Sequence, residues 1–391
     1  MLLTRLRPRF PRWGAFPSGL AGVALGLALV VAPASAMETP ARQAILVDDT
    51  TGAVLFEKNA YEPMPPASMS KLMTVYLLFE RLALGSIKLD DTFPVSEKAW
   101  RMGGSKMFVR VGTNVTVEDL LRGIIVQSGN DACIVVAEGL AGTEEAFAVE
   151  MNKKARELGL TGSNFVNSTG WPDPEQVMTA ADLALLARRI IRDFPQYYGY
   201  FKEKNFTYNK IRQGNRNPLL YRNIGADGLK TGHTEASGYG LTASAKRGDR
   251  RLVLVVNGLE SVNQRAREAE RLLAWGFREF DNYALFKAGD RVDEAEVWLG
   301  DAPTVPLVAS RDIVVTLARK ARRAMTVKVV YDGPIAAPIA KGAEIAKLIV
   351  TAPDVEPVEV PLLAGAQIGQ LGLFGRLMAA LGHLVWGAAK Q

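Results

Sequence analysis

The chain has 391 residues, enough for two domains with buried cores, and its formal net charge of +6 falls to +2 without the first 36 residues. This small positive excess does not indicate a nucleic-acid partner. Cys133 is the only cysteine, which excludes an internal disulfide, and we expect it to be a buried structural thiol. The two histidines are 150 residues apart, so we expect no metal ion and no cofactor.

Residues 1–36 have the pattern of a secretory signal peptide. Four arginines among the first 12 residues precede an uncharged apolar run at residues 19–31, and Ala34-Ser35-Ala36 offers small residues for cleavage. We therefore expect an exported protein that is cut after Ala36. A retained membrane anchor is the alternative, but the apolar run is short for a membrane span.

Two apolar runs, at residues 44–47 and 53–56, flank an Asp-Asp-Thr-Thr-Gly segment that is typical of a hairpin turn. A largely apolar helix is then expected from Ser68 to about Gly85. Ser68 and Lys71 would lie on one face at its first turn. A buried lysine tends to lose its proton, so its amine could activate the serine as a nucleophile. The alternative is an ordinary helix start with a lysine that reaches solvent.

Residues 86–112 are irregular and rich in Gly, Ser and Lys, so we expect a loop that borders a site. Thr116 is a candidate N-cap for a helix over residues 117–126. The turn Ser128-Gly129-Asn130 follows it and leads into a second apolar helix. A hydroxyl and a carboxamide in such a buried turn each need a partner. A plain helix connector is the alternative, because the same spacing recurs at Ser261-Val262-Asn263.

Helices are expected at residues 144–158 and, capped by Thr179, at residues 180–193. The turn-rich loop Asn167–Glu175 joins them. Lys230-Thr231-Gly232-His233-Thr234 then leads into an alternating pattern that is typical of strands. A long apolar strand and a helix over residues 267–280 complete the first domain, residues 37–282.

The composition changes after about residue 283, where short runs rich in β-branched residues alternate with Gly and Pro turns. We expect residues 283–365 to form an all-β domain without chemistry of its own. Residues 366–391 contain apolar side chains at helical spacing and no acidic residue. This tail is too interrupted to span a membrane, and we expect an amphipathic helix that lies on the membrane surface. A helix docked on the β domain is the alternative.

Three of these patterns occur in a fixed order. Ser68-x-x-Lys71, Ser128-x-Asn130 and Lys230-Thr231-Gly232 match the motif set of penicillin-binding proteins and serine β-lactamases. Over residues 44–280 the chain resembles the low-molecular-mass penicillin-binding proteins that act as D-alanyl-D-alanine carboxypeptidases. The resemblance is most specific at residues 127–133, 230–234 and 267–270, and the β domain and tail also match the layout of that family.

The resemblance implies an α/β (α+β) fold of the penicillin-binding and β-lactamase type. An antiparallel sheet flanked by helices would be followed by a small all-β domain and a C-terminal amphipathic helix. The expected substrate is a peptidoglycan stem peptide that ends in D-Ala-D-Ala, and β-lactam antibiotics are expected to acylate the enzyme. The expected location is the periplasmic face of the inner membrane, where the C-terminal helix would hold the protein peripherally.

The resemblance also implies the catalytic roles. Ser68 would attack the carbonyl between the two D-alanines, and Lys71 would take the proton of the serine. Ser128, between Lys71 and Lys230, would relay a proton to the leaving amine.

Substrate binding is implied in the same way. Asn130 would bind the substrate amide, and the backbone N–H groups of Ser68 and His233 would form an oxyanion hole. The strand that carries Lys230-Thr231-Gly232 would lie at a sheet edge and pair with the extended peptide. Thr231 and Arg267 would hold the terminal carboxylate. Ion pairing on a helix surface is the alternative for Arg267.

Other activities share this motif set. A D,D-endopeptidase would act on cross-linked peptidoglycan, and a penicillin-binding scaffold would barely turn over. The best-known serine β-lactamases use a loop glutamate to activate water, and Glu175 lies in a suitable region of the chain. The loop Gly170–Gln176, which departs from the Gly-Leu-Asp-x-x-Gly-Gln pattern usual in the carboxypeptidase family, bears on substrate specificity and acyl-enzyme lifetime. The β domain and the tail favour a cell-wall enzyme.

Overall fold

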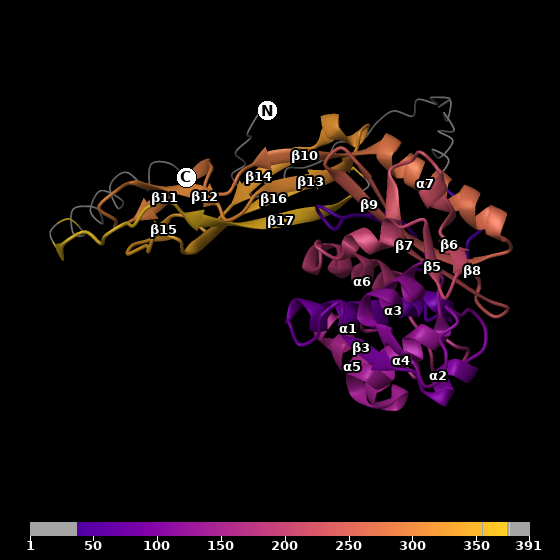
Figure 1. Ribbon diagram of the computed structural model, residues 1–391. Coiled ribbons are helices and arrows are strands. Elements are labelled where there is room, and N and C mark those ends of the chain that lie inside the picture. Colours follow the sequence, from indigo (N-terminus) through magenta and orange to yellow (C-terminus); the bar gives the residue numbers. More distant parts are fainter. Residues whose placement is uncertain (1–36, 354, 374, 376–391) are drawn as a thin grey trace, which may run out of the picture. The chain divides into compact units, whose positions relative to one another are not determined.

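The computed structural model describes residues 37–375 except residues 354 and 374. The chain divides into a unit of residues Met37–Phe280 and a second unit that begins at Asp281, two residues before the predicted boundary (Figure 1). The predicted signal peptide and most of the predicted tail helix lie outside the described residues. Within the described part, no helix is long and apolar enough to cross a membrane.

The first unit is built on a five-stranded antiparallel sheet with the strand order β2-β1-β9-β8-β7. Its strands are β1 (Gln43–Asp48), β2 (Val54–Lys58), β7 (Ala226–Thr234), β8 (Gly238–Arg247) and β9 (Arg250–Leu259). The predicted hairpin is formed by β1 and β2. Strand β7, which carries Lys230-Thr231-Gly232, lies at the sheet edge as predicted. An edge strand has backbone groups that can pair with a further strand.

Helices cover both faces of this sheet. The α-helices of the unit are α1 (Lys71–Ala83), α2 (Glu97–Arg101), α3 (Val117–Ile125), α4 (Asn130–Ala141), α5 (Glu144–Leu158), α6 (Ala180–Asp193) and α7 (Val262–Glu279). Short 3₁₀ helices are η1 (Ala67–Ser70), η2 (Tyr198–Lys202) and η3 (Pro218–Tyr221). Two small hairpins pair β3 (Thr92–Pro94) with β4 (Asn114–Thr116) and β5 (Asn205–Tyr208) with β6 (Ile211–Gly214).

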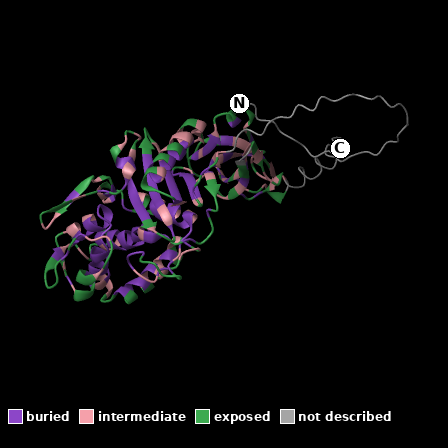
Figure 2. Cartoon of the chain, turned by 90° about the vertical axis from the view of Figure 1, so that its right-hand side faces the viewer, coloured by how far each residue is buried: buried purple, intermediate pink, exposed green. Residues whose placement is uncertain are grey.

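The sheet divides the hydrophobic core into two layers, because successive side chains of each central strand point to opposite faces of the sheet. Ile45 and Val255 belong to the cluster that contains the buried side chains of α1, α3, α4 and α6. Leu46 and Leu254 belong to a second cluster, which includes Leu272 of α7. Figure 2 shows the central strands buried along most of their length. The sheet therefore forms a rigid support for the edge strand β7.

Side-chain caps fix where several helices begin. The hydroxyl groups of Thr116 and Thr179 accept hydrogen bonds from the backbone N–H groups three residues later, as predicted. Ser261 caps α7 in the same way, so the second Ser-x-Asn pattern marks a helix start. Helix α7 thus begins five residues earlier than the sequence prediction of Arg267.

The second unit consists of β-strands around one core. A six-stranded sheet has the order β14-β16-β17-β12-β11-β15, and β10 pairs with β13 in a second sheet. The strands are β10 (Phe280–Phe286), β11 (Arg291–Trp298), β12 (Thr304–Ala309), β13 (Ile313–Ala318), β14 (Thr326–Val330), β15 (Ile335–Ala336), β16 (Glu344–Ala352) and β17 (Val355–Ala364), with the 3₁₀ helix η4 (Ala321–Ala324). Buried residues from both sheets, such as Ile313 and Leu348, share one hydrophobic cluster. The predicted all-β fold is present.

Candidate active site

Ser68 and Lys71 meet at the junction of η1 and α1. Ser68 lies in the 3₁₀ helix and Lys71 is the first residue of α1, so the predicted α-helical turn is a 3₁₀ turn. Side chains three residues apart eclipse in a 3₁₀ helix, which places both on one line. Lys71 Nζ lies 2.8 Å from Ser68 Oγ. The sequence prediction of a serine in contact with a lysine amine is therefore realised in this geometry.

The amine of Lys71 is fully buried. Besides Ser68 Oγ, it contacts Asn130 Oδ1 at 2.7 Å and the backbone carbonyl of Thr169. The pKa of Lys71 is lowered to about 8, mainly by burial; Cys133 opposes this lowering, the charge of Arg216 contributes to it, and Asp131 opposes it more weakly. Near neutral pH a useful fraction of this amine is therefore unprotonated and able to accept the serine proton.

Lys230 on β7 is also buried, at 2% exposure. Burial holds its pKa well below the ordinary lysine value, and the charges of Lys71 and Arg216 act in the same direction. Its amine donates a hydrogen bond to the carbonyl of Thr231 at 3.3 Å, a long contact for a buried cation. Two buried lysines thus lie close enough for the charge of one to disfavour protonation of the other.

The turn between α3 and α4 holds the second motif. Ser128 has a positive φ of 65° and is 2% exposed, and its Oγ has no hydrogen-bond partner among the described residues. Asn130 begins α4, and its Nδ2 donates to the carbonyl of Gly103 at 2.9 Å. The buried carboxylate of Asp131 accepts hydrogen bonds from three successive N–H groups, residues 107–109, at 2.9–3.2 Å. The loop predicted to border the site is thereby fastened to it.

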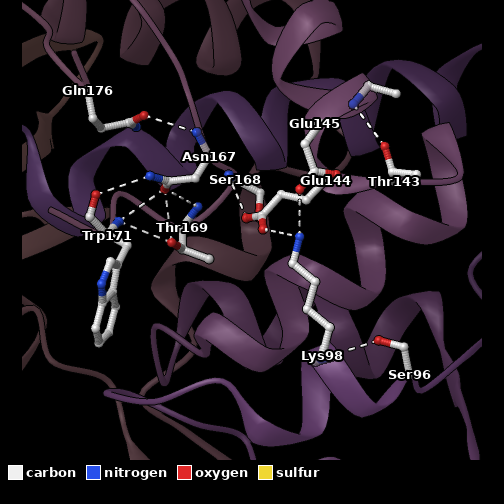
Figure 3. A network of polar contacts seen from close by, with 12 residues as sticks. Ser96, Lys98, Thr143, Glu144, Glu145, Asn167, Ser168, Thr169, Trp171 and Gln176 are labelled. Atoms are coloured by element: carbon white, nitrogen blue, oxygen red, sulfur yellow. Dashed lines mark hydrogen bonds and ion pairs between the residues drawn. The ribbon is translucent and has the colours of Figure 1, made fainter. Parts of the chain in front are cut away.

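The loop between α5 and α6 presents a carbonyl to Lys71, and Figure 3 shows how this loop is held. Asn167 Oδ1 accepts hydrogen bonds from the N–H groups of Thr169, Gly170 and Trp171 at 2.8–3.1 Å. Ser168 donates through both its N–H and its hydroxyl to Glu144. A Cβ on Gly170 would stand 2.0 Å from the carbonyl oxygen of Ala67, so only glycine lets this loop approach η1.

The edge strand β7 approaches the nucleophile closely. A Cβ on Gly232 would lie 2.9 Å from the carbonyl oxygen of Pro66, so a glycine is needed there. Thr231 is buried, whereas His233 is exposed and stacks on Tyr239 with ring centroids 3.9 Å apart. The strand therefore passes directly beside η1.

The structure places Arg265 and Arg267 on different faces of α7. Arg267 lies on the exposed face of α7, whereas Arg265 is buried on the face toward the sheet. Two positions along a helix differ by about 200°, so the two arginines cannot share a face. Arg265 Nη1 reaches the carbonyls of Gly232 and Gly240, at 3.5 and 3.3 Å, and its buried Nε has no partner among the described residues. Arg265 is therefore the arginine of α7 beside the third motif.

Arg216 is a further basic residue of the site. It donates to Ser105 Oγ at 2.6 Å, and its charge lowers the pKa of Lys71, Lys230 and Arg265. Lys71, Lys230, Arg216 and Arg265 thus form a group of basic side chains that influence one another electrostatically. Such a concentration of positive charge suits a substrate with an anionic end.

Comparison with known proteins identifies the family. A family model described as D-alanyl-D-alanine carboxypeptidase matches residues 30–261, and one described as the C-terminal domain of penicillin-binding protein 5 matches residues 280–370. The chain belongs to the D-alanyl-D-alanine carboxypeptidase family. It is similar to the D-alanyl-D-alanine carboxypeptidase DacC of Escherichia coli, with 40% identity over 345 residues that cover 86% of each chain.

Solved structures agree with this assignment. The penicillin-binding protein 5 structure from Haemophilus influenzae is similar with a TM-score of 0.79 and 36% identity, and the match covers 85% of this chain and 99% of that one. Penicillin-binding protein D2 of Listeria monocytogenes, solved in an ampicillin-bound form, matches 62% of this chain and 98% of its own with a TM-score of 0.57 and 29% identity. The predicted penicillin-binding fold with its C-terminal all-β domain and the serine carboxypeptidase assignment are confirmed, whereas the predicted C-terminal helix stays a prediction.

Other residues of this carboxypeptidase bear on the alternatives. Among the described residues, no group of three or more His, Cys, Asp and Glu side chains gathers to hold a metal ion.

Burial raises the pKa of Cys133 to about 12, so its thiol stays protonated as expected of a structural cysteine. Glu175 is exposed, and no hydrogen bond of its carboxylate to the described residues directs it toward Ser68.

Proposed function

We propose that this carboxypeptidase removes the terminal D-alanine of peptidoglycan stem peptides through an acyl-enzyme on Ser68, and that β-lactams acylate the same serine. The observation that carries this proposal is the 2.8 Å contact between Ser68 Oγ and the fully buried amine of Lys71. The lowered pKa of that amine supplies a base at neutral pH without a histidine.

In the proposed acylation, neutral Lys71 takes the proton of Ser68 as its oxygen attacks the carbonyl carbon between the two D-alanines. The backbone N–H groups of Ser68 and His233 stabilise the oxyanion. Ser128 gives its proton to the leaving amine of D-alanine and recovers one from Lys71, while Lys230 stabilises the alkoxide character of Ser128. Water then hydrolyses the ester and regenerates Ser68. The buried hydroxyl of Ser128, which has no hydrogen-bond partner in the described part of the chain, supports this relay.

The substrate is proposed to add to the edge strand β7 by main-chain hydrogen bonds, with Asn130 bound to its amide. Its terminal carboxylate would lie near Thr231 and receive charge-assisted hydrogen bonds from Arg265. The Nε of Arg265, which no described residue contacts by a hydrogen bond, and the charge of Arg216 support this position. Arg267, on the exposed face of α7, takes no part in this proposal.

The activity is tested by comparing three substrates. We expect rapid release of D-alanine from a free pentapeptide, slower cleavage of cross-linked peptide dimers, and very slow turnover of a penicillin after stoichiometric acylation. The reason is that the basic site binds the free carboxylate of a terminal D-alanine, whereas the carboxyl group of a cross-linked D-alanine forms the amide bond of the cross-link. Faster cleavage of cross-links would instead identify an endopeptidase, and rapid penicillin turnover a β-lactamase.

We also propose that the enzyme is exported and that residues 371–391 hold it on the periplasmic surface of the inner membrane. The signal-like residues 1–36 and the apolar spacing and basic charge of the tail support this location. A chain that ends after Gln370 keeps the bridge of Gln370 to Gly300 and the buried Ile368, so the β unit stays intact.

This shortened enzyme is expected in the soluble periplasmic fraction, with hydrolysis of small peptides near the full-length rate. The full-length enzyme is expected in the membrane fraction and to be partly released by salt, because exposed charges are screened. Fractionation followed by penicillin labelling measures both. Membrane association of the shortened form, or a soluble full-length form, would contradict attachment by the tail.

A further inference from the structure

A cavity of about 320 Å³ opens beside the nucleophile. Its walls are largely apolar and include Pro66, Ala67, Trp171, Pro172, Pro174 and Thr234. Among the described residues that line it, Asp173 alone carries a charge. The volume is at the lower end of the range for ligand pockets, about 300–1,000 Å³. It therefore suits a side chain or a short ligand segment.

The position of the cavity along β7 relates it to the substrate. Ala67 immediately precedes Ser68, and Thr234 ends β7 three residues after Thr231. Three strand residues span about 10 Å, close to the distance between a terminal carboxylate and the third residue of an extended peptide. With the carboxylate at Thr231 and Arg265, the third residue from the peptide end lies beside Thr234.

We propose that this cavity binds the side chain of the residue that precedes the two D-alanines, and that Asp173 receives a cationic group at the end of that side chain. The inference rests on the proposed function, which fixes the direction of the peptide. It names Trp171 and Asp173 as residues that determine specificity on the acyl side of the scissile bond.

The chemistry of the walls fits such a side chain. The indole of Trp171 is 46% exposed, and a Cβ on Gly104 would stand 3.0 Å from it, so the ring reaches the loop after α2. Methylene groups gain by covering such an exposed ring, and an ammonium gains over its face. Asp173 Oδ1 accepts the N–H of Glu175 at 2.8 Å, and no ion pair within the described part of the chain neutralises this carboxylate.

The loop that carries both residues is held before any ligand arrives. The N–H of Trp171 donates to Asn167 Oδ1 and to Thr169 Oγ1, each at 3.0 Å, while its indole projects away from these groups (Figure 3). Gln176 Oε1 accepts hydrogen bonds from the N–H groups of Val166 and Asn167. A loop fixed in this way loses little conformational freedom on binding, which favours selectivity.

Three substrates that end in D-Ala-D-Ala test the inference: the acetyl dipeptide, the Nα-acetyl-L-lysyl tripeptide and its Nα,Nε-diacetyl form. We expect the wild type to hydrolyse the free-ammonium peptide with a kcat/KM about two- to fivefold above that of the diacetyl peptide, as for an exposed ion pair. Asp173→Asn is expected to bring this ratio to about one. Glu175→Gln removes the same charge from the same loop outside the cavity and is expected to keep the wild-type ratio.

Trp171 is tested by comparing kcat/KM for the diacetyl-lysyl peptide with kcat/KM for the acetyl dipeptide. Trp171→Ala is expected to lower the ratio of these two values about tenfold, because apolar contact is lost. Trp171→Leu should lower it less, and penicillin labelling of each variant verifies folding. If the kcat/KM ratios stay at their wild-type values in Asp173→Asn and in both Trp171 variants, this inference is overturned. Hydrolysis of the acetyl dipeptide would in that case still uphold the proposed function. Failure of the wild type to hydrolyse any of the three would overturn both.

Discussion

Lys71→Met is expected to slow acylation of Ser68 by a penicillin about 10²- to 10⁴-fold, the usual contribution of a general base. Methionine has a similar length and accepts full burial, so the variant should fold while losing the amine 2.8 Å from Ser68 Oγ. The measurement is the rate of labelling by a fluorescent penicillin. Thermal unfolding of the variant serves as the folding control. Acylation at the wild-type rate would exclude Lys71 as the base.

The pH dependence follows from the same amine. A base acts in its neutral form, and the pKa of Lys71 is lowered to about 8, so the acylation rate should rise with pH and level off above that value. The charge of Arg216 lowers this pKa, and its removal in Arg216→Gln should move the midpoint to higher pH. A profile that falls as the pH rises through 8 would contradict a neutral lysine base.

Arg265→Ala is expected to lower kcat/KM for a free D-Ala-D-Ala terminus about ten- to hundredfold, because a lost hydrogen bond between charged groups costs about 1.5–3 kcal/mol. Arg267→Ala is the matched control, since it removes the same charge from the exposed face of the same helix. We expect this control to stay within about twofold of the wild type.

A substrate that ends in an amide separates carboxylate binding from a structural role. Without the terminal charge, Arg265→Ala should lose much less relative to the wild type. Equal losses on the acid and the amide would mean that Arg265, which contacts the carbonyls of Gly232 and Gly240, supports the fold of β7. A larger loss of kcat/KM in Arg267→Ala than in Arg265→Ala would support the sequence prediction that Arg267 holds the carboxylate.

The sequence predicted those parts of the fold that follow from local pattern. Alternation and turn residues located the β1–β2 hairpin and predicted the all-β character of the second unit, and threonine caps located α3 and α6. The spacing of Ser68 and Lys71 predicted their contact. It did not predict the 3₁₀ turn, because Ala67 has a positive φ of 47° that its side chain does not encode.

Other parts of the site depend on contacts between distant segments. Thr169 reaches Lys71 through a backbone carbonyl, and Arg216 acts from a loop without any motif. Which of Arg265 and Arg267 faces the sheet depends on which positions of α7 are buried, and the sequence does indicate these positions. Ser261 followed three residues later by Gln264 is a helix-start pattern, and the buried positions 266, 269, 272 and 273 continue the face of Arg265.

Location of the penicillin adduct tests the Ser68–Lys71 mechanism most directly. Intact-protein mass spectrometry of the wild type should show the mass of one penicillin added. Fragmentation should place that mass on Ser68, which separates it from the neighbouring Ser70. The Ser68→Ala variant should carry no adduct. An adduct that persists in Ser68→Ala, or one found on another residue of the wild type, would contradict a nucleophilic Ser68.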